Sequence, residues 1–390
     1  MTLTRRQLLK KVLNHGPILA LGGSLLETTA LAAPSQWHLG PLTEENALGL
    51  RLPEGVKARV IATSGEPVST VSPSSHEWHK SPDGGACFTT QAGGWIYVSN
   101  CEEFFFRGGA GAIEFAKDGT IQRAYPILKH TQGNCAGGAT PWGTWLSCEE
   151  VDGGYVYETD PTGHQPAKKR PALGRFRHEA VAVDDIHGHL YLTEDEKDGC
   201  LYRFTPDQPL PYLDSGRLEV ACVDPVTGVV GWTPINDPIP NPLLFQTRTR
   251  YQETSACQFA GGEGIWFQSG MVYFTTKRDN RVWVLDTQTN QLTVLYDAQE
   301  KSSPVLSGVD NLCSAPDGRL LVAEDGGDMQ LVLLDHKGNA QPLVQVMGQK
   351  GSEITGPAFW PDGRRLYFSS QRGKDADRRL GITYELFLSV

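Results

Sequence analysis

Six segments of the chain repeat one pattern of hydrophobic and polar positions. Each begins with a glycine, continues as a short run of aromatic or β-branched residues, and ends in polar or acidic residues. Such runs suit a pleated, half-buried strand. The glycines lie 49, 45, 82, 48 and 45 residues apart, so the pattern predicts a repeat of about 45 residues. The six segments are 94–100, 143–149, 188–194, 270–276, 318–324 and 363–369.

A second predicted strand begins 12 to 19 residues after each of the first five glycines, often closed by an Asp/Gly turn. A period in the forties with several strands per unit is typical of propeller blades. The sequence therefore predicts an all-β fold, a six-bladed β-propeller with short four-stranded antiparallel blades around a central channel. The one long gap contains a Pro-rich segment at about 206–250, which we interpret as an insertion. A β-sandwich with fortuitous internal similarity is the alternative.

The N-terminus has the features of an export signal. Residues 4–10 read Thr-Arg-Arg-Gln-Leu-Leu-Lys, an apolar stretch follows at 17–26, and Ala30-Leu31-Ala32 offers a cleavage site. We expect residues 1–32 to be a twin-arginine signal peptide and 33–390 to be a single propeller domain. The expected partner is then the twin-arginine translocase, and the expected location is periplasmic or secreted. An amphipathic first helix is the alternative.

Composition and charge exclude several classes of protein. The 43 glycines and 25 prolines agree with a fold made of many short turns. A net charge of −10 argues against a nucleic-acid partner, which usually leaves a basic footprint. No apolar run after the N-terminus approaches the ~18 residues of a membrane span. The eight cysteines include no CxxC pair, which argues against structural zinc and leaves their pairing open.

Propeller geometry brings acidic residues together at one rim of the channel, where the first strand of each blade starts and the second ends. The expected strand starts are Gly85, Cys135, Glu179, Glu263, Asp310 and Pro357. The expected strand ends are Asn100, Glu149, Glu194, Thr276, Glu324 and Ser369, followed by Cys101, Glu150, Asp195, Lys277, Asp325 and Ser370. Crowded carboxylates repel one another, and hard cations would neutralise them. The soft thiolate of Cys135 favours iron at that corner. Alternatively, these acids are solvated strand ends.

Several motifs resemble the PhoX-type alkaline phosphatases. The most specific is Gly-Asn-Cys-Ala-Gly-Gly-Ala-Thr-Pro-Trp-Gly-Thr-Trp-Leu-Ser-Cys-Glu-Glu at 133–150, and others lie at 177–183, 191–195, 262–264, 310–312 and 324–327. The resemblance implies a phosphomonoesterase with an iron–calcium cluster on the propeller axis. It implies Cys135 and Glu179 as iron or cluster ligands, Glu150 and Asp310 as calcium ligands, and Glu263 as a further ligand.

The implied chemistry is clamping of the phosphate by metal ions and activation of an oxygen nucleophile. Glu149 joins the candidate metal ligands from its position at a strand end. Glu263 and Arg177 are the candidate catalytic residues. The chain departs from the family at Gly261, where those phosphatases carry an arginine suited to bidentate phosphate contact. Arg177 is a candidate replacement, with a surface salt bridge as its alternative role.

Two further interpretations stay open. The chain also resembles gluconolactonase-type propellers, which hold one calcium ion, and Glu263, Asp310 and Asn311 would serve as ligands there. It would then be a calcium-dependent lactonase-like hydrolase. Residues 356–370 resemble the repeat of periplasmic binding propellers, which points to a catalytically inactive binding protein. The expected ligand is otherwise a small phosphate ester.

Overall fold

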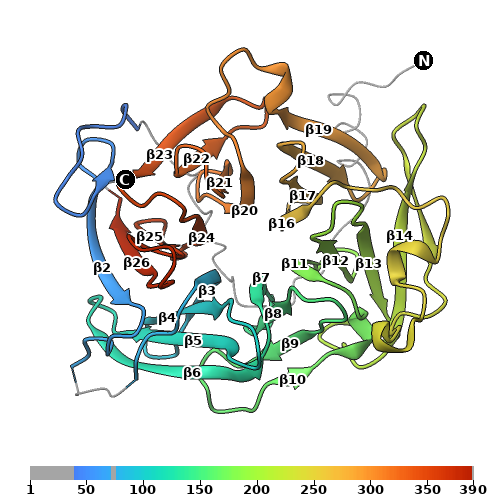
Figure 1. Cartoon of the computed structure of the whole chain (residues 1–390), viewed down its shortest axis with the longest axis horizontal. Coiled ribbons are helices and arrows are strands. Elements are labelled where there is room, and N and C mark those ends of the chain that lie inside the picture. Colours follow the sequence, from blue (N-terminus) through green and yellow to red (C-terminus); the bar gives the residue numbers. More distant parts are fainter. Residues whose placement is uncertain (1–38, 72–75, 389–390) are drawn as a thin grey trace, which may run out of the picture. The chain divides into compact units, whose positions relative to one another are not determined.

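The computed structural model describes residues 39–71 and 76–388. In these residues six antiparallel sheets stand around a common axis, and the fold is the six-bladed β-propeller that the repeat predicts (Figure 1). The predicted signal peptide, 1–32, lies outside the described residues. Within them no helix is long or apolar enough to cross a membrane.

Blades 1 and 2 have four strands each, arranged in sequence order from the axis outwards. Blade 1 contains β3 (Pro82–Thr89), β4 (Trp95–Cys101), β5 (Gly108–Phe115) and β6 (Ile121–Thr131). Blade 2 contains β7 (Asn134–Ala139), β8 (Trp145–Glu149), β9 (Val156–Thr159) and β10 (Lys168–Lys169), followed by the short 3₁₀ helix η1 (Pro171–Leu173). The repeated segments 94–100 and 143–149 are thus second strands of their blades.

The first part of the segment 206–250 belongs to blade 3. The strands of this blade are β11 (His178–Asp184), β12 (His189–Glu194), β13 (Leu201–Pro206), β14 (Gly216–Val223) and β15 (Val230–Pro234). The first part of the segment therefore supplies two outer strands, and the rest carries η2 (Pro242–Leu244) and η3 (Thr249–Tyr251). Blade 4 contains β16 (Gly262–Gln268), β17 (Met271–Thr276), β18 (Arg281–Asp286) and β19 (Gln291–Asp297), followed by η4 (Ala298–Glu300).

The last two blades are completed by strands from near the start of the described chain. Blade 5 contains β20 (Val309–Ser314), β21 (Leu320–Glu324), β22 (Gln330–Leu334) and β23 (Ala340–Val346), with β1 (Leu50–Arg51) at its edge. Blade 6 contains β24 (Ile354–Phe359), β25 (Arg365–Ser370) and β26 (Ile382–Phe387), and β2 (Lys57–Thr63) is its outermost strand. Pairing of β2 with β26 closes the ring without a covalent link.

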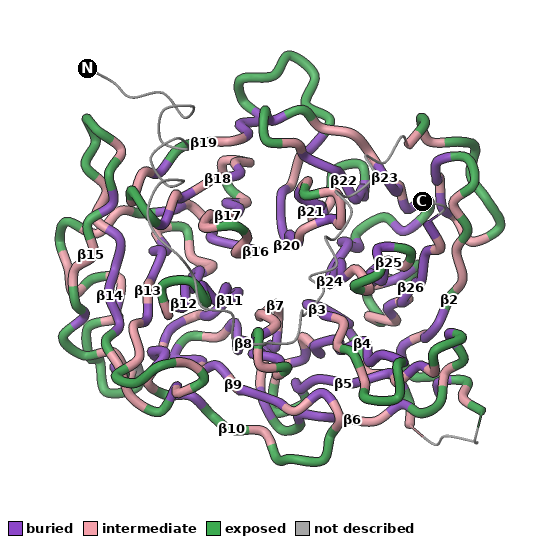
Figure 2. Tube along the Cα trace, turned by 180° about the vertical axis from the view of Figure 1, so that it is seen from behind, coloured by how far each residue is buried: buried purple, intermediate pink, exposed green. Residues whose placement is uncertain are grey.

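Hydrophobic side chains alternate along the strands and pack between neighbouring blades, so the buried residues follow the blades around the ring (Figure 2). Between blades 1 and 6, the rings of Tyr97 and Tyr367 stack with centroids 5.0 Å apart. The inner strands approach one another so closely that some positions accept only glycine. A Cβ atom at Gly84 would lie 2.5 Å from the Cα of Ala136 in the next blade.

The innermost strands of blades 1 to 5 share a β-bulge near their start. In each, the register with the second strand shifts after the first residue, for example between Asn134 and Gly137 in β7 and between Val309 and Leu312 in β20. A bulge turns a side chain away from the regular alternation and is common at barrel rims and active sites. In this chain it places one extra residue per blade at the same rim of the channel.

Candidate metal centre

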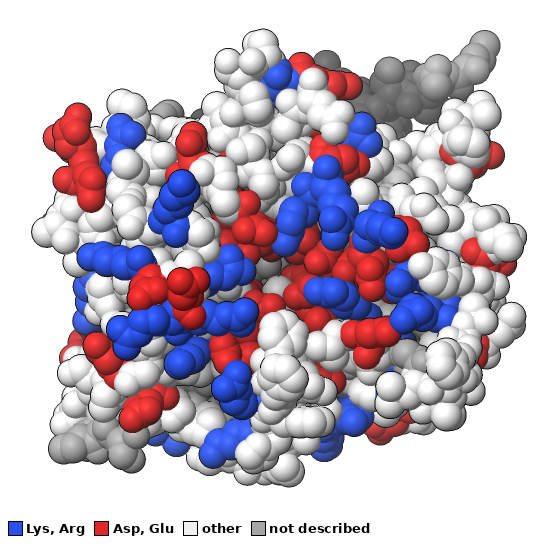
Figure 3. All heavy atoms as spheres, in the orientation of Figure 1, with Lys and Arg blue, Asp and Glu red and all other residues white. Residues whose placement is uncertain are grey.

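Two positions in each blade line this rim. The first is the first bulged residue, which is Asp83, Cys135, Glu179, Glu263 or Asp310 in blades 1 to 5. The second directly follows the second strand. In blades 1, 2, 4 and 5 the backbone N–H of Glu102, Glu150, Lys277 and Asp325 donates to the carbonyl oxygen two positions before the first bulged residue of the same blade. In blade 6 the backbone N–H of Gln371 donates to the carbonyl oxygen of Glu353. Blade 3 has Asp195 after its second strand. We call these residues, with Glu353, the acidic ring. Figure 3 shows Asp and Glu side chains gathered around the middle of one face, with Lys and Arg side chains beside them.

The ring brings potential ligand atoms within 4.8 Å of one another in three groups, which are Cys135–Glu150–Glu179, Glu179–Glu263–Asp310 and Asp310–Asp325–Glu353. The groups share Glu179 and Asp310, so they form a continuous arc across blades 2 to 6. Five of the six predicted metal ligands lie on this arc. The spacing of the repeat therefore identified residues that the fold does bring together.

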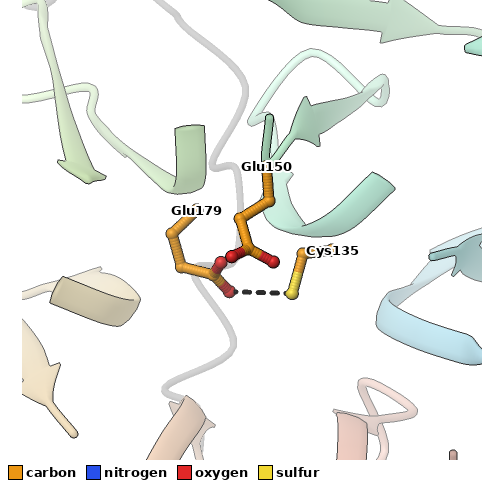
Figure 4. Close-up of side chains that lie close together, drawn as sticks. All are labelled: Cys135, Glu150 and Glu179. Atoms are coloured by element: carbon orange, nitrogen blue, oxygen red, sulfur yellow. Dashed lines mark hydrogen bonds between the residues drawn. The ribbon is translucent and has the colours of Figure 1, made fainter. Parts of the chain in front are cut away.

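The first group combines a thiol with two carboxylates (Figure 4). The Cys135 Sγ donates to Glu179 Oε1 at 3.2 Å, and Glu150 points toward the same place from the end of β8. Glu179 is fully buried, and its second oxygen, Oε2, has no hydrogen-bond partner. A buried carboxylate oxygen without a partner is costly unless a cation binds it. The group therefore fits a metal ion with a mixed sulfur and oxygen ligand set.

Burial and like charges raise the pKa values around the arc. Burial is the main cause for Glu150, whose pKa rises to about 8 although Arg177 opposes the shift. Burial, followed by the charges of Glu150 and Asp310, raises the pKa of Glu179 well above its usual range. Burial also raises the pKa of Asp310 to about 6, against the effect of Lys277. Glu150 and Glu179 thus need further positive charge to be fully ionised at neutral pH.

Cationic and amide groups already satisfy part of the ring. Lys277 Nζ lies 3.0 Å from Glu263 Oε1 and 3.1 Å from Asp325 Oδ2. The amide of Gln371 donates to Asp83 Oδ2 at 2.6 Å and to Glu102 Oε2 at 2.8 Å. At the rim, Arg177 contacts Glu150 Oε1 through Nε at 2.9 Å and Nη2 at 2.6 Å. Arg177 therefore forms the salt bridge considered as its alternative role, with a side chain that stays 38% exposed.

Glu149, the sixth predicted metal ligand, lies outside the three groups formed by the described residues. Its carboxylate accepts the backbone N–H of Gln132 at 3.0 Å and that of Tyr155 at 3.1 Å. Glu324 does the same in blade 5, accepting from Ser307 at 2.7 Å and Gln330 at 3.0 Å. These contacts tie the loop before the first strand to the start of the third.

Counting from the repeated glycines missed three acidic residues of the ring. In blade 1 the expected strand start was Gly85, but Gly85 pairs with Ser99 within the sheet, and Asp83 is the first bulged residue. The second strand, β4, continues through Cys101, so the rim position after it is Glu102 rather than the expected Cys101. In blade 6 the expected Pro357 lies well inside β24, and Glu353 precedes that strand.

The channel continues from the ring along the inner strands as a cavity of about 340 Å³. All six blades contribute small or apolar residues to its lining, including Gly84, Ala136, Ala180, Gly264, Leu312 and Gly356. Charged ligand groups are thus concentrated at the rim, and the channel next to them is mainly apolar.

Gly261, where the resemblance implies a family arginine, has a left-handed backbone with φ +71°. A Cβ there would lie 3.1 Å from Arg278 Cγ and 3.2 Å from Asp195 Oδ1. The exposed side chain of Arg278 therefore covers the place where a side chain at position 261 would begin. Neither residue belongs to the three potential ligand groups of the described chain.

The fold and the ring define a β-propeller with an arc of carboxylate and thiol groups, which could hold cations, at one end of its channel. The sequence matches the family model described as alkaline phosphatase PhoX over residues 102–153 and 151–373, more than half of the chain. The chain therefore belongs to the PhoX family of alkaline phosphatases. Comparison with curated protein sequences gave no match.

Solved structures support the same fold. Pseudomonas fluorescens PhoX in complex with vanadate, a transition state analogue, matches with a TM-score of 0.72 and 18% identity, covering 90% of this chain and 98% of that one. A gluconolactonase from Xanthomonas campestris matches with a TM-score of 0.50 and 12% identity, covering 92% of this chain and 97% of the other. At these identities the likeness concerns the fold alone.

Proposed function

We propose that this chain is an exported, metal-dependent hydrolase that cleaves phosphoric monoesters, with iron and calcium bound at the acidic ring. The observation that carries the proposal is the first group, in which the Cys135 thiol and two buried carboxylates converge and Glu179 Oε2 is unpartnered. Membership of the PhoX family supplies the reaction class. Export rests on the twin-arginine motif at residues 4–10.

Cys135 and Glu179 would hold iron, because a thiolate is a softer ligand than calcium prefers. Glu150, the third member of their group, stays the calcium ligand that the family resemblance implies. The oxygen-only groups around Asp310 would hold calcium, since hard cations favour carboxylates. Bound cations of this kind supply Lewis-acid polarisation of the phosphoryl oxygens. Glu149 is a weaker candidate as a ligand, because both of its oxygens already accept backbone hydrogen bonds.

Arg177 would contact the phosphate from the rim. Both of its hydrogen bonds to Glu150 end on one oxygen, Oε1, and the side chain remains partly exposed. The remaining guanidinium N–H groups can therefore donate charge-assisted hydrogen bonds to phosphate oxygens. Arg278, which covers Gly261, offers a second exposed guanidinium at the same rim. In this proposal the two arginines take over substrate contact where position 261 has no side chain.

Glu263 is proposed both as a ligand and as a catalytic residue. Its carboxylate lies in the second group next to Asp310, which suits ligation, and burial raises its pKa well above the usual range against the effect of Lys277. A Glu263→Gln variant separates these roles. If Glu263 only binds metal, the metal content and the rate fall together. If it also transfers a proton, the rate falls further than the metal content does.

The test is elemental analysis of protein exported by its own signal, combined with assays on an aryl phosphate ester and a sugar lactone. We expect iron together with calcium, loss of iron in Cys135→Ala, and hydrolysis of the phosphate ester. Calcium alone with lactone hydrolysis would instead favour the lactonase-like alternative. Metal-loaded protein inert toward phosphomonoesters would overturn the proposed activity, and protein without bound metal would favour a binding propeller.

A further inference from the structure

Blade 4 breaks the charge pattern of the ring. At the position after the second strand, four blades carry a carboxylate, and these residues are Glu102, Glu150, Asp195 and Asp325. Blade 4 carries Lys277 there, although its backbone N–H makes the same hydrogen bond, to Gly261 O at 2.8 Å. The lysine therefore occupies a ring position in full register with the carboxylates. The difference lies in the side chain and not in the local fold.

The Lys277 ammonium joins two of the potential ligand groups. It lies 3.0 Å from Oε1 of Glu263, which belongs to the second group. It lies 3.1 Å from Oδ2 of Asp325, which belongs to the third group. Asp310 is common to both groups.

An ammonium group and a divalent ion compete for these two oxygens. Calcium binds carboxylate oxygens at about 2.3–2.6 Å, so an ion bound to both Glu263 and Asp325 would lie close to Lys277 Nζ. Two positive charges at that separation repel strongly in a partly buried site. The site between Glu263 and Asp325 therefore holds either the lysine or a metal ion.

We propose that Lys277 is a built-in cation that takes the place of one divalent ion between Glu263 and Asp325. The inference rests on the proposed metal centre and deepens it, because it limits how many ions the ring binds. The ring oxygens that Lys277 does not contact remain for metal ions. The lysine neutralises the part of the arc between Glu263 and Asp325 at every metal concentration.

The test counts bound ions in Lys277→Met and Lys277→Gln, both of which remove the charge. Each purified protein is equilibrated with calcium, freed of excess ion, and analysed for calcium and iron per chain. Both variants are expected to hold one more calcium ion than wild type, with unchanged iron. Lys277→Arg keeps the charge and is expected to keep the wild-type count. Equal calcium counts in wild type and either folded neutral variant would overturn the inference.

Arg281→Gln is the matched control. Arg281 lies in the same blade, its side chain is 33% exposed against 32% for Lys277, and it also pairs with two carboxylates. These are Asp279 at 3.2 Å and Asp297 at 2.7 Å, which are not ring residues. Removal of this cation is expected to leave the calcium count unchanged. An equal gain in Arg281→Gln would contradict a specific role for Lys277.

Calorimetric titration of chelator-treated protein with calcium separates this inference from the proposed function. Wild-type protein purified without any metal would contradict the proposed function. The inference still predicts one additional calcium site in the titration of Lys277→Met, and a titration identical to that of wild type would overturn it. We also expect calcium to raise the melting temperature of Lys277→Met more than that of wild type, since each ion that binds only the folded state adds to its stability.

Discussion

Two carboxylates that are adjacent in sequence at the end of β8 have different roles. Glu149 accepts two backbone hydrogen bonds and holds the blade together, whereas Glu150 lies in the first potential ligand group. Blade 5 repeats the arrangement with Glu324 and Asp325. Because successive side chains of a strand point to opposite sides, one residue of each pair reaches the loops and the other the axis. The presence of an acidic residue at a strand end therefore does not by itself identify a potential metal ligand. The strand register identifies it, because the register decides which side chain faces the axis.

The largest effect is expected from removing a carboxylate that two groups share. Glu179→Gln is expected to reduce bound metal at least tenfold, because Glu179 takes part in the first and second groups and supplies the unpartnered Oε2. Elemental analysis per folded chain is the measurement.

Glu219→Gln is the control for this change. Glu219 is also a buried carboxylate, but it pairs with Arg203 at 2.9 Å on the outer strands of blade 3. The metal content of Glu219→Gln is expected to match that of wild type. Full metal content in Glu179→Gln would show that the arc does not ligate through this residue.

The next prediction compares substitutions of Glu149 and of its neighbour Glu150. Glu149→Gln replaces a charged acceptor of two backbone N–H groups with an amide that offers one oxygen, so a cost of about 1–3 kcal/mol is expected. Its metal content should stay near wild type. Glu150→Gln should lose metal without lowering the stability of the metal-free protein.

The shifted pKa of Glu150 determines whether its removal raises or lowers the stability of the folded protein. Folding raises the pKa of Glu150 from its usual value to about 8, so holding this side chain in the fold costs stability as the pH rises above its unfolded pKa. A neutral amide avoids that cost. Thermal melts of chelated protein and elemental analysis check both variants. A stability loss in Glu150→Gln as large as that in Glu149→Gln would contradict the separate roles of these two residues.

The sequence predicted the six blades because each repeat carries its own glycine and β-favouring run. It predicted Cys135, Glu179, Glu263 and Asp310 because the distance from glycine to bulge is nearly constant in blades 2 to 5. It missed Asp83, because the distance from the repeated glycine to the bulge is longer in blade 1. The contact of Lys277 with Asp325 depends on how blades 4 and 5 pack, and no local pattern encodes that distance.

A smaller effect is expected for Arg177→Gln. If Arg177 contacts the phosphate, loss of one charge-assisted hydrogen bond is expected to raise KM for an aryl phosphate about tenfold, with metal content unchanged. Arg248→Gln is the control, since Arg248 is similarly exposed and pairs with Asp152 at 2.6 Å outside the ring. An unchanged KM in Arg177→Gln would leave its salt bridge with Glu150 as its main role.

The smallest effect is expected at Gly261. Gly261→Ala forces a side chain into the left-handed region and is expected to cost about 1–2 kcal/mol of stability. Gly318→Ala is its control, because that glycine has φ +88° and nothing within 4 Å of an added Cβ. The two variants thus share the backbone cost, but only the Cβ at position 261 meets Arg278 and Asp195. If Arg278 helps bind the phosphate, KM should rise in Gly261→Ala alone, because the new Cβ displaces that guanidinium. Equal KM values in both variants would show that the rim next to position 261 does not contact the substrate.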